Sequence, residues 1–211
     1  MHAYFDQGLD AQNQEMARYH PWDTQVSDRR NHYTDFKGMP RNQVARNLED
    51  IDKGGNIARE ATLDFLTWAN SDGVPFETND FGMLSIQPNR ERQSSKGLVL
   101  TGRVTVFFRD LRANVPDRRL LGFGQVLEME LRGIDPGWRD ACWAWSLWPH
   151  GFTDLKNPDL PPDDDDMMFG DVICLNLWVW GDSVEEIGLA YKRAFGNLRT
   201  ALEAAAAKFT I

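Results

Sequence analysis

Apolar residues fill every second position from Ile173 to Val179, within a run from Val172 to Trp180 that predicts a β-strand in the last quarter of the sequence. One face of this strand carries only apolar side chains, whereas the other face is mixed and includes Asn176 and Trp178. β-Branched and aromatic residues suit a pleated surface, and the run is too short for a typical helix. We therefore expect a strand whose two faces are both largely covered.

A helical pattern follows this strand directly. Ser183 can cap the first helical N–H groups, and Glu186, three residues later, completes a capping box. Gly188 and Gly196 each cost roughly 1 kcal/mol relative to alanine, so we expect them to allow a close approach to the sheet. A long helix is thus predicted up to about Lys208. Its apolar residues recur at spacings of three and four: Ile187, Ala190, Tyr191, Ala194, Leu198, Ala201, Leu202 and Ala205.

The stretch from Asn42 to Ala69 is also helical in pattern, because apolar residues return every three or four positions. The pair Gly54 and Gly55 interrupts this pattern, so we expect two helices or one kinked helix. Gly73 and Pro75 then prevent the second helix from continuing.

Strand-like alternation occupies the middle of the chain. The run from Leu98 to Phe108 places apolar side chains on one face, and the run from Leu120 to Leu131 repeats this pattern. We interpret these two runs as neighbouring strands of an antiparallel hairpin with one solvated face. Ala141 to Trp148 is a further predicted strand, and Phe81 to Gln87 is a shorter candidate.

These elements predict an α+β fold in which two or three helices pack on one face of a single antiparallel sheet of four or five strands. Residues 41–211 would form this single domain, with a long acidic loop at residues 151–170. Residues 1–40 are polar and aperiodic, with scattered aromatic side chains, so we expect an extended N-terminal arm. The arm would lie either across a neighbouring subunit or back on its own domain.

The formal net charge of −9 restricts the classes of partner. A sequence-independent nucleic-acid binder needs a basic face, and an anionic membrane surface would repel this chain. The sequence has no run of about 18 apolar residues, so we expect neither a membrane span nor a secretion signal. Cys142 and Cys174 lie in apolar runs, which is typical of buried thiols in a protein made in a cytoplasm.

Motifs for catalysis or metal binding are weak. His150 and Asp154 flank a turn, and no nucleophile motif accompanies them. The other three histidines all lie within residues 1–40, so they form no zinc-binding pattern with His150. The run of four aspartates at 163–166 lacks the alternation and the glycine of a calcium loop, and a solvated loop that can dock to a basic partner is favoured. We therefore predict no catalytic residue, metal or cofactor.

Tryptophan is the most unusual part of the composition. A sheet that carries several tryptophans can form a core, a ligand platform or a subunit interface. The core is the default, because aromatic side chains bury a large apolar area, but tryptophan is also enriched at the centres of protein contacts. The predicted interface residues are Trp143, Trp145, Trp148, Trp178, Trp180, Tyr4, Phe5, Trp22, Asp163, Asp164, Asp165 and Asp166.

The segment from Asp171 to Ser183, followed by the helix through Ala207, resembles the ending of tail-terminator and related tail-completion (neck) proteins of tailed bacteriophages. In that family, helices precede a small antiparallel sheet, and a helix with alanines closes the fold after an aromatic-rich last strand. The earlier order of helices and strands in this chain is compatible with that pattern. The chain is longer than the family pattern, and residues 1–40 and 151–170 are additions to it.

The resemblance implies a non-enzymatic structural protein that forms a homo-oligomeric ring at the end of a tail tube or in the neck. Such a protein would be made in the host cytoplasm and reside in the virion, with tube and neck proteins as partners and DNA only as passing cargo. An acidic ring lumen would repel the DNA and let it slide. Two alternatives stay open: an acidic inhibitor or immunity-type module that neutralises a basic partner, and an enzyme that uses His150 with the aspartate run.

Overall fold

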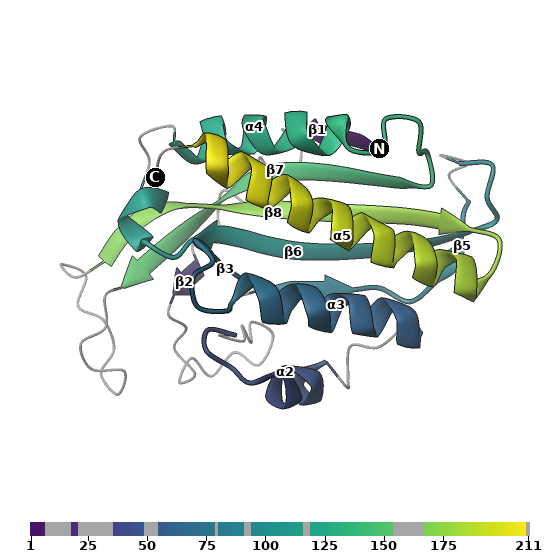
Figure 1. Ribbon diagram of the computed structural model, residues 1–211, viewed down its shortest axis with the longest axis horizontal. Helices are drawn as coiled ribbons and strands as arrows, with labels where there is room; N and C mark the ends of the chain where they lie inside the picture. Colours follow the sequence, from purple (N-terminus) through teal and green to yellow (C-terminus); the bar gives the residue numbers. More distant parts are fainter. Residues whose placement is uncertain are drawn as a thin grey trace.

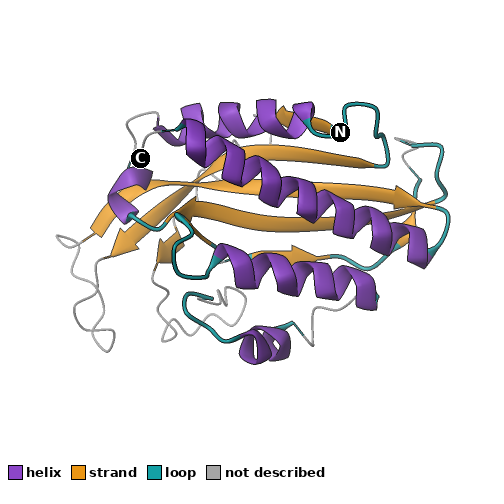
Figure 2. Ribbon diagram, in the orientation of Figure 1, coloured by secondary structure: helices purple, strands orange, loops and turns teal. Residues whose placement is uncertain are grey.

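The structure is a computed structural model that describes residues 1–6, 18–20, 36–48, 55–78, 80–90, 94–115, 119–153 and 167–209. These residues form two layers, a β-sheet and a set of helices that cover one of its faces (Figures 1 and 2). The predicted α+β class is therefore confirmed.

Three long strands form the centre of the sheet: β6 (Leu98–Phe108), β7 (Ala141–Thr153) and β8 (Met167–Gly181). β8 pairs antiparallel with both β6 and β7, so it lies between them although it follows both in the sequence. β6 and β7 consequently run parallel to each other. Parallel strands need a long crossover connection, and helix α4 (Arg119–Gly133) lies in that connection.

Shorter strands bring the described sheet to eight strands. β1 (His2–Phe5) and β2 (Arg18–His20) pair parallel with β7. β3 (Phe76–Glu77), β4 (Phe81–Met83) and β5 (Gln87–Pro88) pair antiparallel with β6. The sheet is therefore mixed, and the prediction of a purely antiparallel sheet of four or five strands is wrong.

Of the two placements left open for the N-terminal arm, the described residues take the one on their own domain. Residues 2–5 form β1, whose backbone groups bond to β7, and Ala3 is buried against the core. Residues 18–20 extend the same edge of the sheet farther along β7. Backbone groups at a sheet edge gain hydrogen bonds when another strand pairs there, which favours this placement over an isolated arm. Residues 7–17 and 21–35 lie outside the described part of the chain.

The helices α3 (Asn56–Ala69), α4 and α5 (Val184–Lys208) cover one face of the sheet, and α5 crosses its middle diagonally (Figure 1). The short helix α2 (Arg41–Asn47) packs against α3. The predicted helix start is confirmed, because the Glu186 backbone N–H donates to Ser183 Oγ at 3.1 Å. Gly188 does allow a close approach, but to Ile57 of α3 and not to the sheet.

The prediction of a strand from Leu120 to Leu131 is wrong, because these residues belong to α4. The apolar residues of this run fit the two-residue period of a strand, but they also recur at the three- and four-residue spacing of a helix. The helical pattern prevails here because this segment connects two parallel strands and packs against the sheet and α5. The buried residues of α4 are Leu120, Phe123, Gly124, Leu127 and Leu131.

The main core lies between the sheet and the helices. A smaller cluster covers part of the opposite face, toward the end where β8 begins. Its buried members are Phe107, Trp148, Phe152, Val172 and Cys174. No helix of the described residues covers this face, which is called the helix-free face below (Figure 1). Farther along β8 on the same face, Asn176 and Trp178 are only partly buried, so this half of the face is open.

Candidate functional site

Two of the tryptophans predicted for an interface belong to the core. Trp143 and Trp145 are 0% and 1% exposed. The indole N–H of Trp145 donates to Glu128 of α4 at 2.8 Å. Both side chains therefore pack in the core of their own chain, and Trp145 reaches the surface only where it lines a hollow beside β1.

Trp148 also lies in a cluster, on the helix-free face, with the guanidinium of Arg103 5.1 Å from its ring centroid. His150 is buried beside it, with its ring 4.9 Å from that of Phe152. The ring of Phe107 also packs against His150, with the ring centroids 6.3 Å apart. The histidine therefore has aromatic rings among its described neighbours. Its suggested partner Asp154, together with Trp22 and Asp163 to Asp166, lies outside the described residues.

Trp178, Trp180 and Tyr4 lie together on the open half of the helix-free face. The strand register places Trp178 between Thr101 of β6 and Cys142 of β7. Cys142 in turn lies opposite His2 of β1. Side chains at paired positions point to the same face of a sheet, so four strands contribute to one surface.

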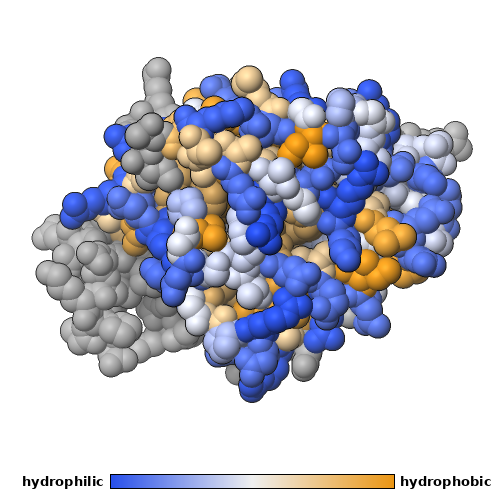
Figure 3. All heavy atoms as spheres, in the orientation of Figure 1, coloured by the Kyte–Doolittle hydropathy of each residue, from blue (hydrophilic) through white to orange (hydrophobic). Residues whose placement is uncertain are grey.

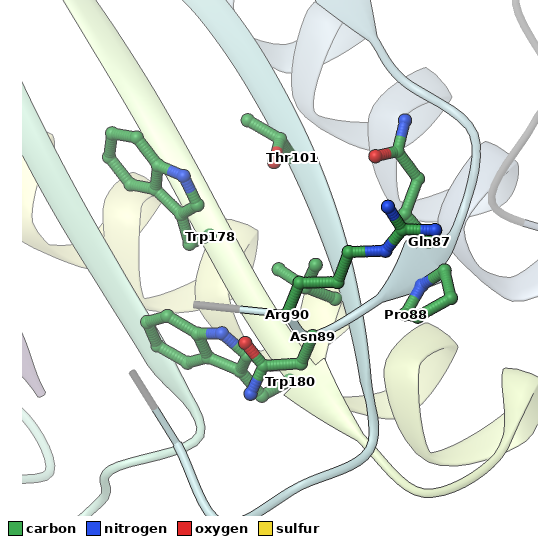
Figure 4. Close-up of a pocket in the computed structure, with 8 residues that line it drawn as sticks. Gln87, Pro88, Asn89, Arg90, Thr101, Trp178 and Trp180 are labelled. Carbon is green, nitrogen blue, oxygen red and sulfur yellow. The ribbon is translucent and has the colours of Figure 1, made fainter. Parts of the chain in front are cut away.

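Two hollows flank the indoles of Trp178 and Trp180, and both indoles line each of them. The larger, of about 460 Å³, is shown in Figure 4. The smaller has a volume of about 290 Å³. The remaining lining residues are Gln87, Pro88, Asn89, Arg90, Val99 and Thr101 for the larger hollow, and His2, Tyr4, Arg139 and Cys142 for the smaller one.

No carboxylate side chain is among these lining residues, although the chain carries a net charge of −9. Arg90 makes no ion pair with any residue in the described ranges, and Arg139 Nη1 lies 2.6 Å from His2 Nε2. Burial raises the pKa of Cys142 to about 11. Because the thiolate is the reactive form, Cys142 is a poor nucleophile at neutral pH. The open half of the face is therefore an aromatic and locally cationic surface suited to binding.

A third hollow, of about 590 Å³, lies beside the edge strand β1 and is lined by Phe5, Met129 and Trp145 among others. Met129 is 70% exposed. Arg132 of α4 fixes β1 here, because its Nε donates to the Ala3 carbonyl at 2.7 Å and its guanidinium pairs with Glu128. Tyr4 and Phe5 alternate along β1, so the same strand borders both the open face and this edge hollow.

The described residues supply neither a metal centre nor a membrane-spanning helix. No three of their histidine, cysteine or acidic side chains gather closely enough to hold a metal ion. None of their helices combines the length and the apolar character that crossing a bilayer requires.

Comparisons with protein-family models, with curated proteins and with solved structures give no match. The function is therefore inferred from the surfaces of this chain. Sequence patterns indicated Trp178, Trp180 and Tyr4, but not Gln87, Arg90 or Thr101. Those residues come together because β5 pairs with β6. A local sequence pattern does not reveal which strands pair.

Proposed function

We propose that this chain is a non-enzymatic structural protein that assembles head to tail into a ring. The observation that carries this proposal is that an exposed apolar side chain lies beside each of two opposite edges of the described sheet, one on α4 and one just after β4. Met129, beside β1, is 70% exposed, and Leu84, just after β4, is 56% exposed. β1 pairs with β7, whereas β4 pairs with β6, so the two lie on opposite sides of the three central strands.

A closed ring needs two different surfaces on each subunit, because every subunit contacts one neighbour with each of them. The two edges meet this requirement. The hollow of about 590 Å³ beside β1 has room for an apolar side chain from the next subunit, and Leu84 is available at the other edge. Because Arg132 already bonds to the Ala3 carbonyl, the contact uses side chains and does not extend the β-ladder.

The hydrophilic character of the helix-covered side supports placing the ring contacts at the sheet edges. Figure 3 shows that hydrophilic atoms dominate this side and that hydrophobic atoms form small separate areas. Large exposed apolar patches mark contact surfaces, and on this side hydrophilic atoms separate the hydrophobic areas (Figure 3).

The particular ring we propose is that of a phage or phage-like particle, at the end of a tail tube or in the neck. The support is the resemblance of the strand–turn–helix unit to tail-terminator and tail-completion proteins, together with the acidic composition. A net charge of −9 per subunit suits a ring through which DNA passes, because like charges keep the DNA from sticking.

Sedimentation-velocity ultracentrifugation of the purified protein tests the ring. We expect the wild type to be oligomeric at micromolar concentration and both Met129→Glu and Leu84→Asp to be smaller, because each places a charge in an apolar contact. The matched control is Leu189→Asp, an equally exposed apolar position (53%) on α5, which should leave the oligomer intact.

Mixing the two defective variants distinguishes a head-to-tail contact from a two-fold one. The Met129→Glu protein keeps its Leu84 edge, and the Leu84→Asp protein keeps its hollow, so the mixture should form a dimer that neither variant forms alone. A monomeric wild type under these conditions refutes the ring and favours the acidic binding module.

A further inference from the structure

The open half of the helix-free face has no role in the proposed ring contact. Along β8, Val172 and Cys174 are buried in the smaller cluster, whereas Asn176 and Trp178 are only partly buried. The open surface is therefore centred on Trp178. Trp178 lies on β8, which β7 separates from the edge strand β1, so we consider its surroundings as a separate binding site.

Trp178 and Trp180 form the common wall of the two hollows, so an elongated ligand that crosses β8 would contact both indoles. Residues two apart on a strand lie about 7 Å apart, which is of the order of one sugar ring with its linkage. Figure 4 shows the two indoles following one another along β8, with the nitrogen of each on the side where Thr101 and Asn89 lie. The larger hollow, of about 460 Å³, has the size of a small-molecule site.

The polar groups around the indoles are suited to hydroxyl groups. Gln87 offers an amide that donates and accepts, and Thr101 offers a hydroxyl. Asn89 offers its Oδ1 as an acceptor, because its Nδ2 already donates to the Ser94 and Lys96 carbonyls at 3.0 and 2.9 Å. Arg90 offers a guanidinium without an ion-pair partner in the described ranges. Trp180 is only 6% exposed, and its indole N–H has no acceptor among the described residues. A buried donor without an acceptor is costly, so a ligand oxygen within reach of this N–H would be stabilising.

We propose that this surface binds a linear, neutral oligosaccharide. One face of a pyranose ring presents C–H groups, which pack against an indole. The hydroxyls project from the rim of the ring, where amide, hydroxyl and guanidinium groups bond to them. Trp178 is the stacking platform in this site, and Gln87, Asn89 and Arg90 bond to the hydroxyls.

A polyanion is a poorer fit to the same surface. Single-stranded nucleic acids also stack on aromatic side chains, but their affinity depends on a cationic groove along the backbone. Here the two hollows contain only Arg90 and Arg139 as arginines, and the whole chain carries a charge of −9. An acidic peptide meets the same repulsion. A neutral sugar chain is not repelled in this way.

Isothermal titration calorimetry tests this site with four probes at millimolar concentration: cellohexaose, chitohexaose, maltohexaose and xylohexaose. Oligo-dT and poly-glutamate are titrated in parallel. We expect at least one hexasaccharide to bind, Trp178→Ala to weaken binding by about tenfold, and Arg90→Ala to weaken it severalfold. Met129→Ala, at the β1 edge, is the control and should bind as the wild type does.

The proposal is overturned if no hexasaccharide binds, or if only oligo-dT or poly-glutamate does. Unchanged affinity of both Trp178→Ala and Arg90→Ala would also overturn it. Arg90 is exposed, so its variant is informative even if the tryptophan variant folds poorly. The ring and the sugar site are tested by variants on different surfaces, so the failure of one proposal is distinguishable from the failure of the other.

Discussion

Gly124 of α4 is the position where an added methyl group has the clearest consequence. A Cβ built on this residue would lie 2.3 Å from Trp145 Cζ3 and 2.5 Å from Cη2. The indole has little freedom to retreat, because it is 1% exposed, packs 4.6 Å from the ring of Phe5, and donates its N–H to Glu128. Gly124→Ala therefore forces either α4 or the indole to move.

The size of the effect follows from three contributions. Overpacking a well-packed core costs about 1–3 kcal/mol. If the indole shifts, its hydrogen bond to the Glu128 carboxylate is weakened, and such bonds contribute about 1.5–3 kcal/mol. Replacing glycine by alanine in a helix gains about 1 kcal/mol. The net expectation is a loss of about 2 kcal/mol in the free energy of unfolding.

Urea denaturation of the variant measures this loss as a lower midpoint at an unchanged slope. The matched control is Gly122→Ala in the same helix, where the added Cβ would lie 3.5 Å from the nearest atom, in the ring of Phe209. This is an ordinary van der Waals contact, so Gly122→Ala should be neutral or stabilising by up to about 1 kcal/mol. Equal stability of the two variants would refute the close packing of α4 on Trp145.

Two further predictions concern ionisable groups. Hydrogen bonds from Arg193 and Asn197 lower the pKa of Asp135 from 3.8 to about 2, so its contribution to stability is present above pH 3.8 and is lost as the pH falls through about 2. At neutral pH, Asp135→Asn should therefore unfold at a lower temperature than the wild type. The difference in unfolding temperature should shrink as the pH falls from 3.8 to about 2. A difference that stays constant with pH would contradict the ion pair. Burial raises the pKa of Cys142 to about 11, so its thiol, which lines an open hollow, should react slowly with Ellman's reagent in the native protein. Cys174 is fully buried and should react only after unfolding. Rapid labelling of Cys142 in the native protein would show that this prediction is wrong.

The sequence predicted the elements whose signal is local. The strand from Val172 to Trp180 and the helix after it were identified, because alternation, a capping box and helical periodicity lie within one continuous stretch. β8 nevertheless begins at Met167 and β7 ends at Thr153, so both strands extend into the loop predicted for residues 151–170. The strand from Leu98 to Phe108 was correct with the same bounds. In each case the side chains that define the pattern also face the core in the folded chain.

The errors arise where distant residues decide the structure. The run from Leu120 to Leu131 fits two periods, and only the parallel arrangement of β6 and β7 selects the helix. β1 is four residues long, and its partner β7 begins at Ala141, so no local pattern reveals the pairing. Likewise, alternation marked Trp178 as a candidate, but the register of four strands decides which residues surround it.

The position of β8 has a consequence for synthesis of the chain. Leu98 pairs with Gly181, so the inner edge of β6 stays without its partner until translation has passed that glycine. At roughly 5–20 residues per second, a nascent chain exposes this apolar edge for several seconds. Ribosome-associated holdases are the expected protectors during that interval, and pausing within the β7–β8 connection would lengthen the exposure and favour aggregation.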